Sequence, residues 1–563
     1  MSELPPFILF YLGAFFVALT QGLLRKVLLI AIPVIGFAML WQTPAGSYAS
    51  FSLLQFELEL FRVDKLSIIF GYLFNIAAFI AIVYALHVRD SLQQVSSLLY
   101  AGSALGAVFA GDLLTLFIFW ELLAITSVFL IWARRNNRAY AAGLRYLVIH
   151  IVSGLIFLAG IVVYYTEHGS LAFNYIGLHG ISGYLIFIAF GIKCAFPLVH
   201  NWLTDAYPES TPTGTVFLSA FTTKVAVCAL VRAYPGTEAL VYIGATMACF
   251  PIFFAVIEND LRRVLAYSLI NQLGFMVVGI GIGTELAING AVAHAFTDVI
   301  FKGLLFMSMG AVLMMTNRIN GSELGGLYKS MPKTTILCIV GAASISAFPL
   351  FSGFVSKSMV MSAALNNNHP WVWLILLFAS AGVFHHAGIK IPYFAFFAHD
   401  SGIRTQDPPR NMLVAMTIAA VLCVAIGVFP GVLYQFLPFD SKYTPYDITH
   451  VLTQLQLLFF SALAFVWLNL RKIYPPELPS VNLDVDWLYR KLFPSVCMKA
   501  LDKCNTLTAR LQRKAISGID SLLNQARSGG RSSGFMLQSW STGRIVSWVV
   551  GLLALYLAIA FLH

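Results

Sequence analysis

The chain has 563 residues, of which 59% are hydrophobic and only 11% are charged, with a net charge of +10. Soluble domains carry about 25% charged residues, and a bilayer span needs about 20 mostly apolar residues, so this composition argues against a soluble protein. It predicts an all-α, polytopic membrane protein. The seven cysteines are scattered without metal-ligand spacing, and no nucleotide-binding fingerprint is present, so we expect no cofactor, no metal and no redox centre.

Apolar segments recur from one end of the chain to the other, and they predict about sixteen membrane-spanning helices. In chain order they cover approximately residues 6–20, 27–41, 66–87, 95–111, 113–132, 141–164, 181–199, 214–231, 238–257, 264–283, 286–316, 334–364, 371–398, 411–435, 451–470 and 543–562. Connections rich in Lys and Arg alternate with connections that have few. The positive-inside rule therefore predicts cytoplasmic basic loops, a cytoplasmic basic tail and both termini outside, as an even number of spans also requires.

The stretch from residue 192 to residue 224 combines buried charge with a helix-breaking proline. Lys193 lies inside an apolar segment, and Pro197 follows it by four residues. Proline lacks an N–H group, so a helix loses a hydrogen bond there and kinks or breaks, at about 3 kcal/mol in an ordinary helix. A polar stretch then leads to a second apolar segment, which carries Lys224. Broken helices beside buried charge are typical of ion sites in transporters.

The four residues around Pro197, Ala-Phe-Pro-Leu, recur around Pro349, again inside an apolar segment. Lys357 follows the second proline within about two turns, near 12 Å by helical rise. Two broken helices, each with a nearby lysine, predict the duplicated repeat found in transporters.

We single out eight ionisable residues within the predicted spans. A charge at the centre of a spanning helix costs about 2.5–3.5 kcal/mol, so eight unpaired charges would cost roughly 20 kcal/mol, more than the stability of a typical domain. They must be paired, solvated, neutral or near the ends of spans. We interpret the set as a proton or ion path, with a structural ion pair as the alternative for any one residue. Its members are Glu121, Lys193, Lys224, His294, Asp298, Lys302, Lys357 and Lys390.

Glu121 is the natural counter-ion for a lysine such as Lys193. A neighbouring carboxylate favours the charged lysine and desolvation favours the neutral one, so opening such a pair would let the lysine release its proton. The alternative is a static salt bridge. Asp112 lies at the mouth of the same predicted helix and is a further candidate.

His294, Asp298 and Lys302 are spaced i, i+4 and i+8, so they form one stripe about 12 Å long on a helix. Such a stripe can pass protons through intervening water, and histidine suits the task because its pKa lies near neutrality. We expect Asp298 to pair with Lys302 at rest. His150 is a further candidate, which taken alone we interpret as structural, and for Lys390 we weigh cavity lining and an interfacial position evenly.

Residues 472–542 differ in character from the rest of the chain. Twelve lysines and arginines and only five acidic residues lie between Arg471 and Arg544, which is typical of a segment at a membrane surface. Leu507, Leu511 and Ile519 belong to an apolar stripe that predicts an amphipathic helix. It serves either as a tether for the final span, residues 543–563, or as a strap that holds partner subunits, which we slightly favour.

Several motifs in this order resemble the antiporter-like subunits shared by Mrp-type multisubunit cation/proton antiporters and respiratory complex I. The resemblance covers roughly residues 60–400. It rests on Val63–Ser67, Phe119–Glu121, Lys193 with Phe196–Leu198, Trp202–Ala206, Thr223–Val225, Asp260–Ser268, His294–Phe296, Phe301–Phe306 and Ser352–Lys357.

The resemblance implies about 14 core helices with two inverted five-helix repeats, each with a broken helix. It implies a TM5-type glutamate at Glu121, a TM7-type lysine at Lys193, a TM8-type lysine at Lys224 and a TM12-type lysine at Lys357. Asp298 departs from the family pattern, in which a histidine is usual. The chain is most similar to the D subunit of the Mrp antiporters. We divide it into N-terminal helices (1–94), a first repeat (95–232), a second repeat (233–400), C-terminal core helices (401–471), the basic segment (472–542) and the final helix (543–563).

These features predict a proton-translocating subunit of a Na⁺ or K⁺/H⁺ antiporter in the inner membrane of a bacterium. Its partners would be other membrane subunits, protons, monovalent cations and the lipid bilayer, with no nucleic acid. One alternative is a proton-pumping subunit of a complex I-related NADH:quinone oxidoreductase or membrane-bound hydrogenase. The other is a structural membrane subunit that transports nothing, although an inert scaffold would gain stability by losing its buried charges.

Overall fold

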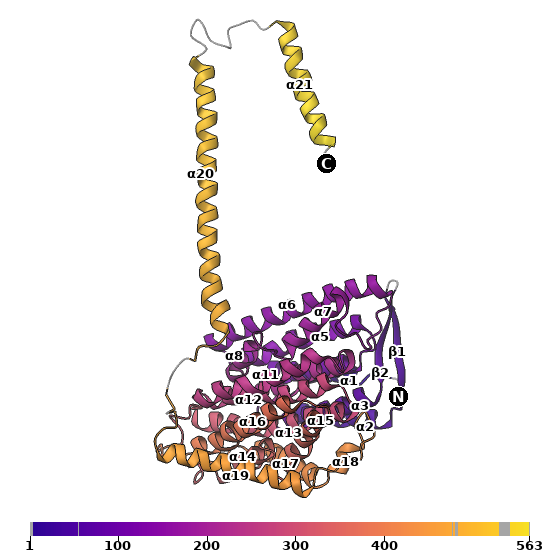
Figure 1. Ribbon diagram of the computed structural model, residues 1–563, viewed down its shortest axis with the longest axis vertical. Helices are drawn as coiled ribbons and strands as arrows, with labels where there is room; N and C mark the ends of the chain where they lie inside the picture. The colour runs from indigo at the N-terminus through magenta and orange to yellow at the C-terminus, as the bar shows by residue number, and fades with distance from the viewer. Residues whose placement is uncertain (1–3, 54–55, 476, 479–481, 529–540, 562–563) are drawn as a thin grey trace. The chain divides into compact units, whose positions relative to one another are not determined.

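The computed structural model describes residues 4–53, 56–475, 477–478, 482–528 and 541–561. The chain divides into two units, Met1–Asn482 and Leu483–His563. The first unit is a helical bundle with one β-hairpin (Figure 1). Its elements are α1 (Pro6–Leu19), α2 (Gly22–Gln42), β1 (Gly46–Leu53), β2 (Phe56–Val63), α3 (Lys65–Ala85), α4 (Ser91–Phe109), α5 (Leu113–Trp132), α6 (Asn137–His168), α7 (Gly180–Lys193), α8 (Asn201–Glu209), α9 (Gly214–Ala220), α10 (Thr222–Ala233), α11 (Glu238–Ile257), α12 (Leu261–Ile282), α13 (Glu285–Thr316), α14 (Pro332–Ile345), α15 (Ser352–Asn366), α16 (Pro370–Val383), the π-helices η1 (Phe384–Lys390) and η2 (Tyr393–Phe397), α17 (Arg410–Val428), α18 (Pro430–Tyr434) and α19 (Ile448–Leu470).

The polytopic membrane architecture is confirmed. Eleven helices of the described chain are long and apolar enough to cross a bilayer, and α1, α7, α14 and the C-terminal helix are shorter apolar helices. With α4, these helices account for each of the sixteen predicted segments. In Figure 1, α5, α6 and α7 lie on one flank of the bundle and α14, α17 and α19 on the other, with α12 and α13 between them.

The hairpin β1–β2 was not predicted and is the exception to an all-helical fold. The two strands pair in antiparallel register from Gly46 opposite Val63 to Leu53 opposite Phe56. The sequence of β2 nevertheless indicates a strand. Its buried residues Leu58, Phe61 and Val63 are interspersed with polar residues, which is close to the alternation of a half-buried strand. Asp64 then caps α3 by accepting a hydrogen bond from the Ser67 amide.

Two features of the bundle recur 148 positions further along the chain. α6 and α13 both have 32 residues, and α13 begins 148 positions after α6. Short β-bridges join Asp112 to Ala172 and Asp260 to Asn320, again 148 positions apart. Asp112 caps α5 and Asp260 caps α12. The same local chemistry therefore builds the start of both parts.

The two broken helices also repeat each other. α7 ends at Lys193 and α14 ends at Ile345, before the two Ala-Phe-Pro-Leu sequences. In each break the alanine and the leucine have positive φ: 60° and 74° at Ala195 and Leu198, and 57° and 73° at Ala347 and Leu350. Such conformations cost non-glycine residues about 1–3 kcal/mol each and persist only where the surrounding fold imposes them. The structure thus ends a helix before each of the prolines Pro197 and Pro349.

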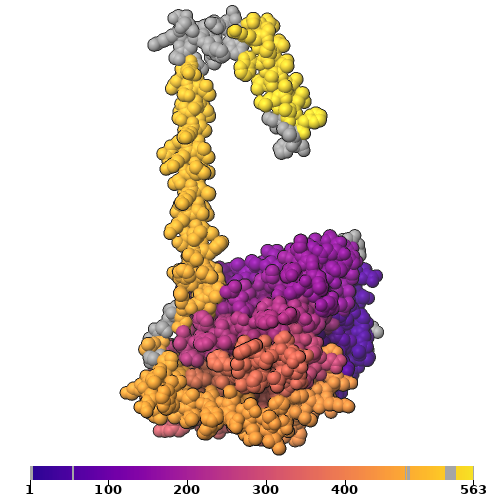
Figure 2. Space-filling model, viewed as in Figure 1, coloured from indigo at the N-terminus to yellow at the C-terminus, as the bar shows by residue number. Residues whose placement is uncertain are grey.

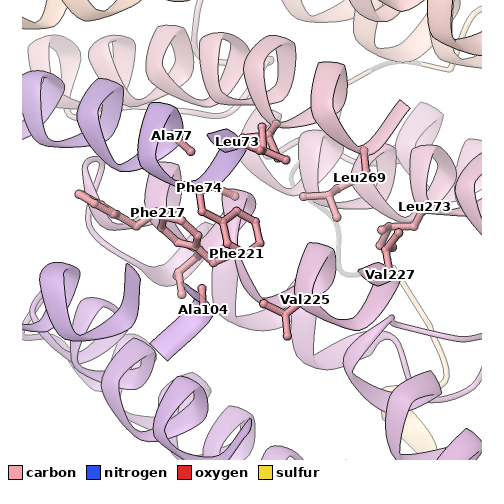
Figure 3. Close-up of a cluster of buried hydrophobic side chains, with 14 of the residues drawn as sticks. Leu73, Phe74, Ala77, Ala104, Phe217, Phe221, Val225, Val227, Leu269 and Leu273 are labelled. Carbon is pink, nitrogen blue, oxygen red and sulfur yellow. The ribbon is translucent and has the colours of Figure 1, made fainter. Parts of the chain in front are cut away.

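A third break, which we did not predict, separates α9 from α10 at Phe221. The Phe221 ring lies 5.3 Å from that of Phe74 and 5.2 Å from that of Tyr100, in edge-to-face contact. Figure 3 shows Phe221 among apolar side chains from α3, α4, α9, α10 and α12. This packing fixes the start of α10 and hence the position of Lys224.

The second unit contains η3 (Leu488–Leu492), α20 (Phe493–Ser528) and α21 (Thr542–Phe561). Figure 2 shows α20 as one continuous rod of side chains, as expected for an unbroken helix of 36 residues. The predicted apolar stripe lies on it, and Leu507, Leu511 and Ile519 are each more than half exposed. The predicted joint before the final helix falls largely on residues 529–540, outside the described residues.

Candidate functional site

Lys193 and Glu121 come together from α7 and α5. Lys193 is fully buried, and its Nζ donates a hydrogen bond to the carbonyl of Trp120, the residue before Glu121. The same Nζ lies 4.3 Å from the centre of the Trp120 ring. Glu121 and Lys193 interact electrostatically, while the buried Glu121 Oε1 has no hydrogen-bond partner. The lysine is therefore held beside the carboxylate and is not locked to that oxygen, as a releasable pair requires.

Gly154 on α6 makes room for the Glu121 carboxylate. A Cβ atom at Gly154 would lie 1.6 Å from Glu121 Oε1, far inside van der Waals contact. The absence of a side chain at this point of α6 thus allows the carboxylate to lie between α5 and α6.

Lys224 pairs with Asp298 at the centre of the unit. Lys224 Nζ lies 2.6 Å from Asp298 Oδ2, and both side chains are 0% exposed. Lys224 also donates a 3.4 Å hydrogen bond to the carbonyl of Ser219, which the break at Phe221 leaves free. This corrects our prediction that Asp298 pairs with Lys302 on its own helix. The ion pair instead joins α10 to α13, two helices that the expected repeat boundary separates.

His294, Asp298 and Lys302 do form one stripe on the continuous helix α13, as predicted. Lys302 is fully buried, and its hydrogen-bond acceptor is the Leu265 carbonyl, 3.5 Å away. Lys302 interacts electrostatically with Asp298, Lys224 and Lys357. It is thus held weakly among three charged neighbours.

Hydroxyl groups connect His294 to the helix that carries Lys357. His294 Nδ1 and Thr297 Oγ1 each lie 2.9 Å from Ser356 Oγ, while His294 Nε2 has no hydrogen-bond partner. Lys357, the residue after Ser356, donates a 2.7 Å hydrogen bond to the Ile345 carbonyl at the second break. We had not singled out Ser356 or Thr297 because isolated hydroxyl residues in apolar helices are common and carry no distinctive spacing.

A cavity of about 170 Å³ lies beside Lys357 and is large enough for several water molecules. Its lining includes hydroxyl, amide and imidazole side chains although most of the lining surface is apolar, and His450 on α19 lies 3.3 Å from the Ser362 hydroxyl. This cavity gives Lys357 room to exchange a proton with water. Its lining residues are Ala347, Phe354, Lys357, Ser358, Met361, Ser362, Leu365, Trp373, Leu377, Thr449, His450, Thr453 and Gln454.

The three further candidates differ from one another. Asp112 caps α5, and its carboxylate accepts hydrogen bonds from the Thr115 amide, the Thr115 hydroxyl and the Glu59 amide at 2.6–2.7 Å. This gives Asp112 a structural role. Lys390 is fully buried and forms an ion pair with Glu477, 2.8 Å away.

His150 lies fully buried between the rings of Tyr146 and Trp202, with centroids 4.3 and 4.4 Å away, and neither ring nitrogen has a hydrogen-bond partner. It interacts electrostatically with Lys193. Asp298 follows His150 by 148 positions, the same interval that separates the starts of α6 and α13, so the two residues occupy equivalent positions in these helices. Both repeats therefore place an ionisable residue at this point of their longest helix.

The structure thus brings together buried acids, lysines and histidines from α5, α7, α10, α13 and α15. Adjacent lysines and carboxylates can exchange a proton when one partner changes its charge or its distance. Within the described part of the chain, no group of three or more His, Cys, Asp and Glu residues could hold a metal ion.

Residues 110–383 match the protein family described as "NADH:quinone oxidoreductase/Mrp antiporter, TM". This range contains the acids, lysines and histidines named above from α5 to α15, but not Lys390 or Glu477. This matching stretch is a little under half of the chain, and it resembles these antiporter-like membrane subunits.

Curated relatives come from several kinds of complex. The probable K(+)/H(+) antiporter A/B subunit of Rhizobium meliloti is 30% identical over 66% of the chain and 40% of its own length. The Na(+)/H(+) antiporter D subunit of Alkalihalophilus pseudofirmus is 28% identical over 58% and 69%. The NADH-quinone oxidoreductase L subunit of Campylobacter jejuni is 27% identical over 68% and 67%. The match to the first of these relatives spans less than half of that protein.

Two solved structures share the fold. A chain of the Mrp complex from Dietzia sp. has a TM-score of 0.67 at 19% identity, over 81% of this chain and 98% of its own. A chain of the membrane-bound sulfane sulfur reductase, an archaeal respiratory membrane complex, has a TM-score of 0.73 at 23% identity, over 99% and 100%.

Proposed function

We propose that the chain is the proton-translocating subunit of a multisubunit Na⁺ or K⁺/H⁺ antiporter, of the D-subunit type. One observation carries this proposal: the fully buried Lys224–Asp298 ion pair between two broken-helix units, with the Glu121–Lys193 pair on one side and Lys357 on the other. A buried ion pair adds little net stability compared with apolar residues of similar volume, so a series of them is better explained by proton transfer than by structural support.

The proposed path begins at Glu121 and Lys193, passes Lys224 and Asp298, and continues along His294 and Lys302 to Lys357. A proton that arrives at one pair weakens it and favours rearrangement of the next, since each group responds to its neighbour's charge. The cavity beside Lys357 has room for water at the far end of the path. The path needs no cofactor.

Contacts between loops support the proposed orientation in a bacterial inner membrane. On the side proposed as cytoplasmic, Arg134 lies 3.2 Å from Glu209, and both Arg134 and Arg262 donate hydrogen bonds to the Pro208 carbonyl. On the opposite side, proposed to hold both termini, Arg232 pairs with Asp64 at 2.7 Å. The basic loops that the charge pattern assigned to one side therefore contact one another.

The repeats are proposed to span residues 95–232 and 233–400, between N-terminal helices at 1–94 and further helices at 401–471. The interval of 148 residues between α6 and α13, and between the two β-bridges, supports this division. The basic segment 472–542 and the final helix 543–563 are proposed to hold partner membrane subunits. The exposed apolar stripe of α20 supports this role, because it gives partners a surface to cover.

The second candidate is a proton-pumping subunit of a redox-linked respiratory complex. The likeness to a chain of the sulfane sulfur reductase complex favours it, because that match covers 99% of the chain. Hydrogenase-4 component B of Escherichia coli is also a relative, 26% identical over 55% of the chain and 52% of its own length. Co-purification of iron–sulfur subunits would favour this candidate, and co-purification of small membrane subunits alone would favour the antiporter.

Replacing Glu121 with Gln tests the proposal. The substitution keeps the shape of the side chain and removes the charge that acts on Lys193. We expect the complex to assemble and coupled proton transport in membrane vesicles to be lost. Normal transport by the assembled Glu121→Gln complex would contradict the proposal.

A further inference from the structure

A second buried charged cluster lies outside the region that matches the family. It is built on the π-helix η1, which continues α16 and ends at Lys390. π-helical turns are rare and occur frequently at functional sites, because the widened turn changes the direction in which side chains point. Gly388 in this turn packs against Ser346 at the second helix break, where an added Cβ would lie 2.2 Å from Ser346 Oγ.

His386 is the inner member of this cluster. Its side chain is 0% exposed, and neither ring nitrogen meets a partner in hydrogen-bonding geometry, although the Gly382 carbonyl acts on the ring. The charged and titratable groups that act on it are Lys302 of the central stripe, His385 and Lys390. An unpartnered buried imidazole lowers the stability of the fold. Its electrostatic interaction with both Lys302 and Lys390 indicates a role in proton transfer.

Lys390 is the middle member. Its Nζ donates hydrogen bonds to the carbonyls of Val256 and Glu258, both at 2.7 Å, and of Ala255 at 3.3 Å, at the C-terminal end of α11. Its Nζ also lies 2.8 Å from Glu477 Oε1, whose side chain is only 5% exposed. Three backbone carbonyls and a carboxylate thus surround the Lys390 ammonium and hold it beside Glu477.

Glu477 is the outer member and comes from the segment after α19. Besides Lys390, Glu258 and Tyr474 act electrostatically on it. Burial raises the pKa of the Glu477 carboxyl, Lys390 lowers it, and the net result is a pKa above the usual value. Glu258 leads from this site to the surface through Arg263, 3.8 Å away, whose side chain is 32% exposed.

We propose that His386 and Glu477 form a lateral branch of the proton path, which connects Lys302 to the membrane surface beside Lys390. The proposal rests on the proposed function and extends it by an exit on the side of the basic loops. The proton released by Lys302 passes through water to one ring nitrogen of His386. The other ring nitrogen gives up its proton through water to the Glu477 carboxylate. Glu477 becomes neutral, its ion pair with Lys390 opens, and release of the proton to the surface closes it again.

The alternative is a static ion pair in which Lys390 caps α11 and Glu477 anchors the segment after α19. The static ion pair and the proton branch predict different transport rates when the side chain at position 386 cannot carry a proton. His386→Gln replaces a neutral polar ring by a neutral amide, so a static pair at Lys390 is left intact. The branch, in contrast, loses the ring that can accept a proton on one nitrogen and release one from the other.

The test measures proton transport against pH in proteoliposomes that contain the purified whole complex. We expect His386→Gln and Glu477→Gln to lower the transport rate at least about a hundredfold, the lower end of the range for loss of a proton-transfer group. We also expect Glu477→Gln to remove the acidic limb of the pH profile. The variant lacks the carboxyl group whose raised pKa produces that limb. Matched controls are His168→Gln, at an exposed histidine of α6, and Glu57→Gln, at an exposed glutamate of β2. Both controls should transport at the wild-type rate.

Glu121→Gln, measured in parallel, separates this proposal from the proposed function. Loss of transport in Glu121→Gln together with normal rates and pH profiles in His386→Gln and Glu477→Gln would overturn the branch and leave the central path standing. Normal transport in Glu121→Gln would overturn the central path itself, and the branch with it. If His386→Gln fails to assemble, His386→Asn replaces it, and failure of both variants to assemble would assign His386 a structural role and overturn the branch.

Discussion

Replacement of Asp298 by Asn should destabilise the protein strongly, because it leaves Lys224 buried and charged without its partner. The two groups are 2.6 Å apart and fully buried. At an effective dielectric constant of about 20, unit charges at this separation attract each other by about 6 kcal/mol. Much of this attraction offsets the cost of desolvation, so we expect a loss of about 3–5 kcal/mol, the usual cost of removing one partner of a buried pair.

A second substitution identifies the partner of Asp298. Adding Lys224→Met to Asp298→Asn removes both charges and should restore most of the stability, since apolar replacements of buried pairs are often neutral. Adding Lys302→Met should not restore it, because Lys302 makes its hydrogen bond to the Leu265 carbonyl and not to Asp298. Neither double variant should transport protons.

The assay is reversible unfolding of the purified protein in mixed micelles with increasing SDS, alongside transport by assembled complexes. Lys65 and Asp440 provide the control: they lie 3.2 Å apart, but their side chains are 66% and 100% exposed. Substitution of Asp440 by Asn should therefore cost less than about 1 kcal/mol. Rescue of Asp298→Asn by Lys302→Met and not by Lys224→Met would refute the pairing described above.

Two further predictions concern the first pair and the C-terminal segment. Gly154→Ala places a methyl group against the Glu121 carboxylate and should lower transport severalfold or more, with assembly retained. Gly431→Ala is the control and should have no effect, because the added Cβ meets open space. Equal transport rates in the two variants would show that the carboxylate moves aside at no cost. Truncation after Asn482 should leave the first unit folded and its Glu477 contacts intact, but it should reduce recovery of partner subunits. Truncation after Leu470 should in addition remove Glu477 and so leave Lys390 without its ion-pair partner. Normal recovery of all partners with the chain truncated after Asn482 would rule out a strap.

The helices and both proline breaks could be predicted from the sequence, because a bilayer demands long apolar segments and proline removes a helix hydrogen bond. Proline alone does not decide a break, since Pro33 and Pro251 lie inside the continuous helices α2 and α11. The break at Phe221 contains no proline or glycine. It depends on the packing of Phe221 against Phe74 and Tyr100, residues more than 100 positions away, which no local pattern reveals. The hairpin was missed because its second strand alternates in polarity and so contains no long apolar run.

The ionisable residues of the site could be predicted as a set, since buried charge stands out in an apolar chain. Their partners could not. Helical spacing correctly placed His294, Asp298 and Lys302 on one stripe, but neighbours on a stripe need not pair, and Asp298 pairs across to Lys224 instead. The pairing of Lys390 with Glu477 joins two residues from distant segments, and nothing in either segment indicates the other. Asp112 was included for its charge, although Asp followed three residues later by Thr also fits a helix cap.

The central claim is that protons pass through titration of buried groups in this chain, and Lys193 tests it most directly. Complexes that differ only in this residue should be reconstituted in proteoliposomes, and their initial rates of proton transport compared. Arginine keeps the positive charge but does not deprotonate readily, so it can pair with Glu121 without relaying a proton. We predict that Lys193→Ala transports least, that Lys193→Arg is also strongly impaired, and that Arg89→Ala, at an exposed loop residue, is normal. Wild-type transport by the assembled Lys193→Arg complex would contradict the account.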